Sequence, residues 1–263
     1  MFENKVVAVT GASGGIGRAI GEMFAQYGAT VALSDLSPPG DAAEAVGTKP
    51  YTCDVTFEPS VVDFIDQVEA DHGPIDIFVS NAGVGSGNGR HVAAASNESW
   101  ETAWNVNVMG SVYAARKLMP GWLERGEGTF VITASAAGLL NQVGSASYSA
   151  TKHAAVSFAE SIAIEHGDQG IRAHCICPQY VRTNMTVGAD FSKNREALLE
   201  PEDVAESLRM AMKEERFLVL PHPVAQKYSV ARASDPDGWL AGMRKMLAKI
   251  KEGGGGPFSG EQV

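Results

Sequence analysis

The sequence predicts an α/β protein of three layers, doubly wound around a parallel sheet. Short apolar runs rich in β-branched residues alternate with helical patterns along most of the chain, and this alternation is typical of right-handed βαβ crossovers. A glycine-rich loop directly follows the first apolar run. The 263 residues, 44% of them hydrophobic, are enough to bury the core of one domain. We expect that domain over residues 1–250 and a flexible tail over residues 251–263.

The alternation predicts each element in turn. Strands are expected at residues 5–10, 29–34, 49–53, 75–80, 128–134, 170–177 and 216–220. Helices are expected at residues 16–27, 59–72, 98–124, 146–168 and 202–214. Between Asp35 and Asp54, Pro38, Pro39 and Gly40 predict a loop with at most a brief helix near residues 41–46.

A helical extension is predicted beyond the last strand. Pro221 and Pro223 stop that strand, and Asp235 provides N-cap chemistry for a helix at residues 237–250. Its apolar stripe at helical spacing consists of Trp239, Met243, Met246 and Ile250. The stripe needs cover, and docking on its own domain explains it about as well as docking on a neighbouring subunit.

The glycine loop has the spacing of a dinucleotide site. Gly11 suits a tight turn, Gly15 lets backbone N–H groups approach a pyrophosphate, and Gly17 lets helix and strand pack closely. The helix that follows offers its N-terminus to an anion. The second strand ends at Asp35, eighteen residues after Gly17, where a carboxylate would reach an adenosine ribose. Strand, loop, helix, strand and acid in this order favour a nucleotide over an unliganded turn.

A second motif indicates proton transfer. Tyr148 and Lys152 are four residues apart, on one face of a predicted helix, and Ser135 lies thirteen residues upstream. A phenol is a poor base at neutral pH, but a neighbouring ammonium favours the phenolate. Lowering its pKa by about 2–3 units needs roughly 3–4 kcal/mol. Alone, a Tyr-x-x-x-Lys pattern is better explained by an ordinary amphipathic helix. Because the nucleotide motif accompanies it here, we interpret Tyr148 and Lys152 as a catalytic pair.

Together these motifs resemble the classical short-chain dehydrogenase/reductase family over residues 5–220. The resemblance rests on Thr10 to Gly17, Asp54-Val55, Asn81-Ala82-Gly83, Asn107, Ser135, Tyr148, Lys152 and the segment Cys177 to Thr183. It implies a Rossmann-type fold with a seven-stranded parallel sheet in the order 3-2-1-4-5-6-7. Two features depart from the family pattern. Gln179 stands where Gly is usual, and the glycine-flanked Asp after the last strand is absent.

The resemblance also implies residue roles. The catalytic residues would be Asn107, Ser135, Tyr148 and Lys152, with Asn107 holding a water that links Lys152 to solvent. The cofactor would be bound by Gly11, Ser13, Gly14, Gly15, Ile16, Gly17, Asp35, Leu36, Asp54, Val55, Asn81, Ala82, Gly83, Tyr148, Lys152, Pro178, Val181 and Thr183. Asp35 would repel a 2′-phosphate, and Gly14 occupies a position where phosphate-preferring relatives often carry a basic residue, so the cofactor is predicted to be NAD. Arg18 is a contrary indication.

The substrate is expected to be a secondary alcohol or its ketone. Its pocket is predicted to include Leu139, Gln142, Val143, Gln179, Tyr180 and Met185, bordered by Leu140, Asn184, Val187 and Phe191. These residues suit an alicyclic, aromatic or steroid-like skeleton and offer no cationic clamp. One alternative is an NADP-dependent carbonyl reductase. Another is a dinucleotide-binding regulator without chemistry, which the presence of Tyr148 and Lys152 disfavours.

Composition narrows the partners. A net charge of −10 and a pI near 5.1 argue against a nucleic-acid surface. The sequence has three cysteines, Cys53, Cys175 and Cys177, all in or beside predicted buried strands. An odd number of buried thiols suits a reducing cytoplasm better than a disulfide framework. Cys175-x-Cys177 has no second ligand pair at metal spacing, so we expect no metal. The first predicted strand begins at residue 5, so we expect no signal peptide. The sequence has no apolar run of 18 residues, so we expect no membrane span either.

The helices expected at residues 98–124 and 146–168 carry apolar residues on more than one face. One face covers the sheet, and the other needs a second partner. In the family that this sequence resembles, the equivalent helices pair across a two-fold axis. We therefore expect a homodimer or a homotetramer.

Overall fold

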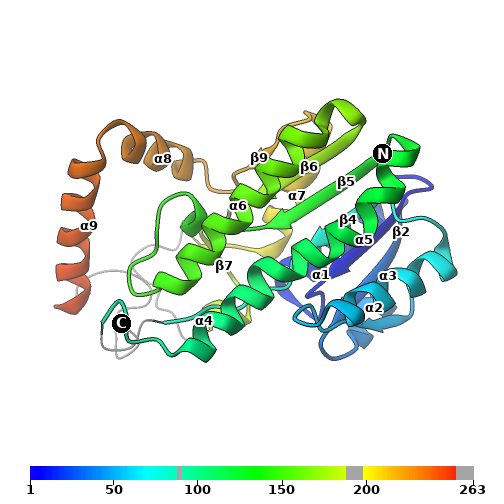
Figure 1. Cartoon of the computed structure of the whole chain (residues 1–263), viewed down its shortest axis with the longest axis horizontal. Coiled ribbons are helices and arrows are strands. Elements are labelled where there is room, and N and C mark those ends of the chain that lie inside the picture. Colours follow the sequence, from blue (N-terminus) through cyan, green and yellow to red (C-terminus); the bar gives the residue numbers. More distant parts are fainter. Residues whose placement is uncertain (88–90, 188–197, 253–263) are drawn as a thin grey trace.

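The computed structural model describes residues 1–87, 91–187 and 198–252. Within them, seven strands form one sheet in the order β3-β2-β1-β4-β5-β6-β9, and all neighbours are parallel (Figure 1). The strands are β1 (Val6–Thr10), β2 (Thr30–Asp35), β3 (Pro50–Thr52), β4 (Ile77–Ser80), β5 (Gly128–Thr133), β6 (Ile171–Ile176) and β9 (Leu218–Val219). Because β9 is the seventh strand of this sheet, the predicted order 3-2-1-4-5-6-7 is confirmed.

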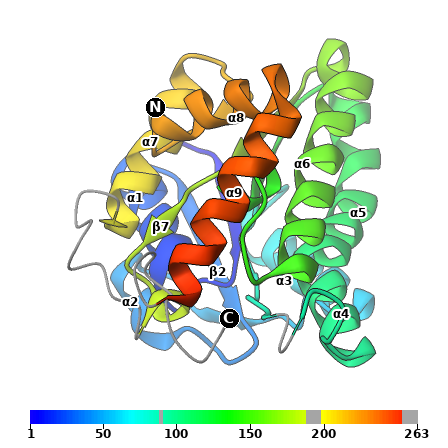
Figure 2. The same cartoon turned by 90° about the vertical axis from the view of Figure 1, so that its left-hand side faces the viewer.

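Helices cover both faces of the sheet, as Figure 2 shows. One face carries α1 (Gly15–Gln26), α2 (Gly40–Ala45) and α7 (Pro201–Lys213). The other carries α3 (Glu58–His72), α4 (Asn97–Trp104), α5 (Gly110–Arg125) and α6 (Ala146–His166). The predicted three-layer, doubly wound architecture is therefore confirmed.

The central strands are mostly apolar because the sheet is buried on both faces. In β1, Val7 and Val9 pack under α1 and α7, whereas Val6 and Ala8 pack under α3 and α5. Phe78 and Phe130 stack on neighbouring strands on the α3/α5 side, with ring centroids 5.6 Å apart. Fully burying such a side chain contributes about 1.5–3 kcal/mol. Truncating Phe78 to Ala would cost about 3–5 kcal/mol, because the packed interior would not close the gap.

This topology fixes where a ligand can bind. The chain runs outward from β1 through β2 to β3, then returns to place β4 on the other side of β1. A crevice opens outside the carboxyl ends of the strands at such a reversal. The loops that follow β1, β2, β4, β5 and β6 all begin at this edge, because parallel strands share one direction.

Three features differ from the sequence expectation. The helix expected at residues 98–124 is interrupted, since α4 and α5 are joined by a π-helical turn, η1 (Asn105–Met109). Two short strands outside the main sheet, β7 (Tyr180–Val181) and β8 (Leu198–Leu199), pair with each other. The 3-10 turns are η2 (Ala136–Gly138), η3 (Gly167–Gln169) and η4 (Asn184–Thr186).

The third difference is an additional helix, α8 (Val224–Ser234), between β9 and the predicted extension. Its sequence has no strong apolar face, and Ala225 is its one fully buried residue, so periodicity did not reveal it. The predicted extension itself is present as α9 (Pro236–Lys251). Asp235 caps it, accepting a hydrogen bond from the Gly238 backbone N–H at 2.9 Å.

Two expectations fall partly outside the described residues. The predicted tail begins at residue 251, and residues 253–263 are not described. Phe191, predicted to border the substrate pocket, is not described either. Among the helices that are described, none is both long enough and apolar enough to span a membrane.

Candidate active site

The glycine loop after β1 is docked against the end of β4. The Asn81 amide donates from Nδ2 to the backbone oxygens of Thr10 (3.1 Å) and Gly11 (2.9 Å). Gly11 has φ +66°, and a Cβ there would lie 2.6 Å from the Ala82 Cα. A side chain would therefore be strained and would also collide with backbone. Glycine at this position lets the loop approach β4 closely.

The same loop leaves an open cradle at the start of α1. A Cβ on Gly17 would come within 2.4 Å of the Asn81 Nδ2 and the Gly11 carbonyl oxygen, so the helix and the loop are in tight contact there. At Gly14, the N-cap of α1, a Cβ would meet nothing within 4 Å. The N-terminus of α1 thus faces open space, and its free N–H groups favour an anion such as a pyrophosphate.

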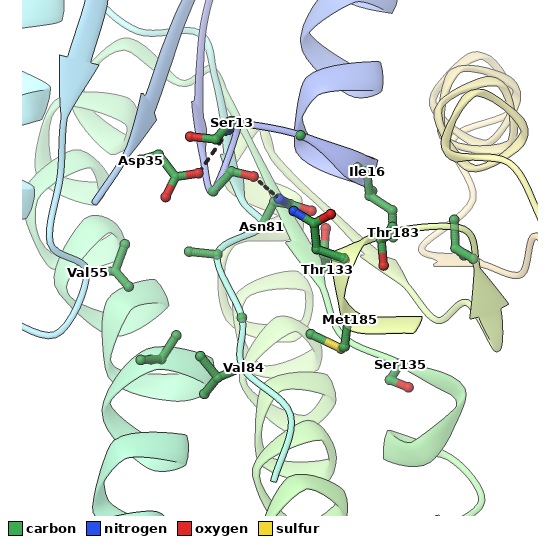
Figure 3. A pocket seen from close by; sticks show the side chains of 18 of the residues that line it. Ser13, Ile16, Asp35, Val55, Asn81, Val84, Thr133, Ser135, Thr183 and Met185 are labelled. Atoms are coloured by element: carbon green, nitrogen blue, oxygen red, sulfur yellow. Dashed lines mark hydrogen bonds between the residues drawn. The ribbon is translucent and has the colours of Figure 1, made fainter. Parts of the chain in front are cut away.

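Asp35 lies at the carboxyl end of β2, beside this loop. Its carboxylate accepts hydrogen bonds from the backbone N–H groups of Ser13 (2.9 Å) and Leu36 (2.7 Å). In Figure 3, Asp35 and Ser13 lie at one side of the pocket, and Ser135 lies at the other. Arg18, the contrary indication for cofactor choice, is paired instead with Glu22 along α1, with Nε 2.7 Å from a carboxylate oxygen.

A cavity of about 540 Å³ follows the carboxyl edge from Asp35 to Ser135. Its lining contains seventeen of the residues predicted to bind the cofactor, namely Gly11, Ser13, Gly14, Gly15, Ile16, Asp35, Leu36, Asp54, Val55, Asn81, Ala82, Gly83, Tyr148, Lys152, Pro178, Val181 and Thr183. Gly17 lies behind the loop instead, where it permits the close packing described above. Thr133 also lines the cavity, and its buried Oγ1 has no hydrogen-bond partner in the described structure. The glycine cradle, the α1 N-terminus and Asp35 together fit a dinucleotide.

Tyr148 and Lys152 project from the first turns of α6 and are both buried. The Lys152 ammonium donates to the Thr133 carbonyl oxygen (2.9 Å) and lies 5.7 Å from the centroid of the Tyr148 ring. Ser135 follows β5 as the N-cap of η2, and its Oγ accepts from the Ala137 N–H (3.1 Å). The three predicted groups are thus brought to one place by α6 and the segment that follows β5.

Burial dominates the protonation of this group. It raises the pKa of Tyr148, although a hydrogen bond with Ser135 acts in the opposite direction. Burial also lowers the pKa of Lys152 from 10.5 to about 8. The sequence predicted that Lys152 would lower the phenol pKa. In the protein without ligands the net direction is upward, because desolvation penalises the phenolate more than its neighbours stabilise it.

Asn107 lies in the π-helical turn η1 and is almost completely buried. Its Oδ1 accepts from the Val84 N–H (2.9 Å), and its Nδ2 donates to the Val84 oxygen (3.0 Å) and to the Thr151 Oγ1 (3.1 Å). A Cβ on Gly83 would lie 3.3 Å from the Asn107 Oδ1 and 3.4 Å from the Lys152 Nζ, so the two groups lie next to the same face of Gly83. The extra residue of a π-turn, a common feature of functional sites, turns the amide toward the β4 loop.

A second cavity of about 710 Å³ adjoins the first and shares Ser135 and Tyr148 with it. Five residues predicted for the substrate pocket line it, namely Gln142, Val143, Gln179, Tyr180 and Met185. Leu139 does not line it but packs against the cluster of Ala136, Leu140 and Ala225, whereas its neighbour Leu140 also lines the cavity. Asn184 lines the first cavity, and Val187 is exposed outside both.

The glycine-rich loop after β4, which the sequence predicted to edge the mouth of the active site, lines the second cavity with Gly85, Ser86 and Gly87. Sequence reasoning did not place Met246 and Ile250 of α9 in the site, and both line this cavity. The stripe that contains the last two was visible in the sequence. Its position beside Tyr148 depends on α8, which was not predicted.

The departure at Gln179 has a structural counterpart. The Gln179 backbone N–H donates to Nδ1 of His222 at 3.1 Å, and the His222 side chain is buried in the turn after β9. The preceding carbonyl, that of Pro178, accepts from the Ala136 N–H at 2.8 Å. A histidine from the end of β9 therefore holds the backbone beside Ser135, in the region where the sequence lacks the expected Asp.

Comparison with known proteins agrees with this geometry. The sequence model of the family described as short chain dehydrogenase matches residues 5–193. Sorbose reductase of Candida albicans is 36% identical over 200 residues, which span 73% of this chain and 70% of that protein. Meso-2,3-butanediol dehydrogenase of Serratia marcescens is 35% identical over 223 residues, 78% of this chain and 85% of that protein.

A solved structure of similar fold is a short chain dehydrogenase/reductase from Burkholderia phymatum in complex with NAD. The similarity covers 90% of this chain and 95% of that chain, with a TM-score of 0.80 and 27% identity. The chain belongs to the short-chain dehydrogenase/reductase family and is an oxidoreductase that binds a nicotinamide dinucleotide.

Proposed function

We propose that this protein transfers hydride between a neutral secondary alcohol, or its ketone, and NAD(H), with Tyr148 as general base in oxidation and general acid in reduction. The observation that carries the proposal is that Tyr148 and Ser135 lie on the wall shared by the two cavities. One cavity has the glycine cradle of a nucleotide site, and the other has room for a substrate. A group on their common wall can touch both reactants.

In oxidation, the Tyr148 phenolate takes the hydroxyl proton of the alcohol while Ser135 donates a hydrogen bond to the same oxygen. A bound oxidised nicotinamide supplies the acceptor for the hydride that leaves the carbinol carbon. Lys152 offsets the cost of the phenolate, because its ammonium lies over the Tyr148 ring and the positive charge of the oxidised cofactor acts in the same direction. In reduction, Tyr148 returns the proton to the oxygen.

Lys152 and Asn107 are given supporting roles. By family resemblance, Lys152 also binds the nicotinamide ribose, and Asn107 holds a water that connects Lys152 to solvent. Their positions next to the same face of Gly83 support this pairing. Such a relay would let the proton taken by Tyr148 leave a buried site.

NAD is favoured over NADP by the charges around the nucleotide cavity. Asp35 lies beside the glycine loop and would meet a 2′-phosphate as a like charge. Among the described lining residues, Lys152 is the one with a basic side chain, and it lies at the nicotinamide end. Arg18 is paired with Glu22. The Burkholderia relative was solved with NAD. An NADP-dependent carbonyl reductase is the alternative, and it would need a basic group that this lining does not offer.

A neutral substrate is favoured by the second cavity. Leu140, Val143, Met185, Met246 and Ile250 contribute apolar side chains, and Asn141, Gln142 and Gln179 contribute amides. No described lining residue carries a charge, so a carboxylate or phosphate would lose hydration without gaining a partner. We also assign the protein to a reducing cytoplasm, because its three cysteines are all free and buried.

The proposal is tested by incubating the protein with a panel of secondary alcohols and either NAD or NADP, and measuring absorbance of the reduced nicotinamide. We expect reduction of NAD with neutral alicyclic or aromatic alcohols. Turnover with NADP at the same efficiency would contradict the cofactor assignment. No turnover with any alcohol or, in reverse, any ketone would favour the non-catalytic regulator.

A further inference from the structure

Helix α9 brings two apolar side chains to the substrate cavity from the end of the chain. Met246 and Ile250 are one turn apart and line the cavity that also contains Tyr148 and Ser135. In Figure 1, β5 points toward the side of the molecule where α9 stands, and Figure 2 shows α9 in front of that edge of the sheet. The helix therefore lies across the edge where the strands end and the two cavities open.

This placement is fixed by contacts at the start of the extension. On α8, the Arg232 guanidinium donates to the Leu139 carbonyl oxygen and lies 3.2 Å from Nε2 of His153, one turn after Tyr148 on α6. At the start of α9, Trp239 packs on the cluster formed by Ala136, Leu140 and Ala225. The extension is thus attached to the segment that follows Ser135.

Beyond that attachment, α9 is lightly packed. None of its residues is fully buried, and Met246 is 42% exposed. An apolar side chain on a cavity wall gains stability when a ligand covers it and removes its surface from water. No described residue that lines the cavity is charged. The cavity volume of about 710 Å³ is in the range of pockets for medium-sized ligands.

We propose that Met246 and Ile250 determine substrate size, by packing against an apolar skeleton that extends several carbons beyond the carbinol carbon. This rests on the proposed function and adds the substrate class, which is a neutral polycyclic alcohol or ketone of the terpene or steroid kind. A four-carbon alcohol that occupies the site beside Tyr148 and Ser135 does not reach α9. The helix thereby distinguishes large substrates from small ones.

Dissociation constants of ketones, measured by calorimetry on the full-length protein with saturating oxidised NAD, test this proposal. Ketone and oxidised cofactor cannot react, so the readout does not depend on turnover. The probes are camphor, a 3-ketosteroid and 2-butanone. The variants are Met246→Ala and Ile250→Ala, with Leu240→Ala as a matched control, because Leu240 is 53% exposed on the same helix and does not line the cavity.

We expect each of the two alanine variants to weaken binding of at least one bulky ketone about tenfold relative to 2-butanone, as lost apolar contact in a pocket does. Leu240→Ala should leave the ratio unchanged. A second variant, Ile250→Trp, fills the cavity and should exclude the steroid while 2-butanone still binds. If an alanine variant unfolds, this variant still tests the wall.

Three results would overturn the proposal. The first is that wild-type protein binds 2-butanone as tightly as both bulky ketones. The second is an equal change for large and small ketones in the Met246 and Ile250 variants. The third is a loss of assembly mass in those variants, which would mean that a second copy covers the stripe. Each of these would leave the alcohol oxidation test intact, whereas failure of that test would not change the binding ratios.

Discussion

Burial shifts the pKa values of the residues that would move the proton in the direction that favours their neutral forms. Tyr148 has a raised pKa and Lys152 a lowered one, both chiefly from desolvation. Placing an ionisable pair in such a position costs stability, and functional sites are where proteins accept this cost. Three predictions follow from the chemistry of single side chains.

Tyr148→Phe should remove the proton acceptor while leaving the ring in place. Because general-base catalysis contributes about 10²–10⁴, turnover should fall at least about a hundredfold. Cofactor affinity, measured by fluorescence titration with NADH, should change little, since the glycine cradle and Asp35 are untouched. Turnover close to wild type would contradict the role of Tyr148.

Asp35→Ser should shift cofactor preference toward NADP. The substitution removes a negative charge next to the nucleotide site, and one charge contact is worth about 1–2 kcal/mol. The ratio of the Michaelis constants for the two cofactors should therefore move by about five- to thirtyfold. The serine hydroxyl can still accept from the Ser13 N–H, and the thermal unfolding midpoint without ligands checks that the loop is intact. Wild-type protein that already uses NADP as well as NAD would show the assignment of Asp35 to be wrong.

Lys152→Met should stabilise the protein without ligands at pH 7. The Lys152 pKa of about 8 lies below its usual 10.5, so holding the charged form in the fold costs about 3 kcal/mol at most. Between about pH 8 and 10.5 the unfolded chain binds more protons at this residue, so the wild-type penalty is fully present below pH 8 and disappears as pH rises through that window. Denaturant unfolding should show the variant more stable by about 1–3 kcal/mol at pH 7, with the difference shrinking by pH 9.5. A less stable variant at pH 7 would contradict this.

At the residue scale, the sequence predicted the side chains that belong to motifs whose fixed spacing serves a chemical role. Gly11, Ser135, Tyr148 and Lys152 belong to such motifs, and the structure brings the last three together. Leu139 was chosen by proximity in the sequence, and adjacent residues in a short turn face different ways, so spacing did not separate it from Leu140. Which residues bind substrate stays a prediction for this reason.

Elements were predicted where the apolar period was strong and missed where it was weak. The seven strands of the main sheet are short apolar runs bounded by turn and loop residues, and their predicted order is confirmed. Helix α8 has no clear apolar face, and the π-turn η1 has the composition of ordinary helix. The pairing of β7 with β8 joins residues far apart in sequence, which local patterns do not encode.

The junction between β9 and α8 gives the fourth prediction. His222→Leu should leave the part-buried Gln179 N–H without its acceptor and lower the free energy of unfolding by about 1–3 kcal/mol. Because Pro178 and Gln179 adjoin Ser135, turnover should fall more than cofactor affinity. His222→Asn should restore part of both, since its amide oxygen can stand in for Nδ1, whereas His222→Gln places its polar atoms nearer Nε2. Equal effects of all three substitutions would show that this hydrogen bond is not what positions the segment.

At the scale of the whole molecule, topology assembles the site from distant parts of the chain. Glycine-loop residues near position 11, the α6 pair and α9 meet at one edge because the strands are parallel and the order reverses at β1. The sequence predicted the edge from the fold class. The sequence did not decide whether α9 docks on its own domain or on a neighbouring subunit. An apolar stripe predicts that the helix face is covered, but it does not identify the surface that covers it. In the structure, Met246 and Ile250 face their own chain's cavity.

The last prediction concerns the surface formed by α4, α5 and α6. Trp104 on α4 is 44% exposed and Ile164 on α6 is 82% exposed, whereas the opposite faces of α5 and α6 cover the sheet. Exposed apolar side chains on helices that lie side by side favour a partner, and a second copy of the chain would close such a surface by two-fold symmetry.

We expect light scattering at micromolar concentration to give two or four times the chain mass of 27.7 kDa. Phe158 is half-buried on α6, and the small exposed residues Ser157 and Ser161 beside it allow a partner helix to approach closely. Ser161→Arg should therefore lower the mass toward that of the monomer. It should also reduce turnover, because α6 carries Tyr148 and Lys152 and would lose its support. Arg substitution at Ser207, partly exposed on α7 on the other side of the sheet, is the matched control and should leave the mass unchanged. A wild-type monomer with full activity would show that α6 needs no partner to hold the site.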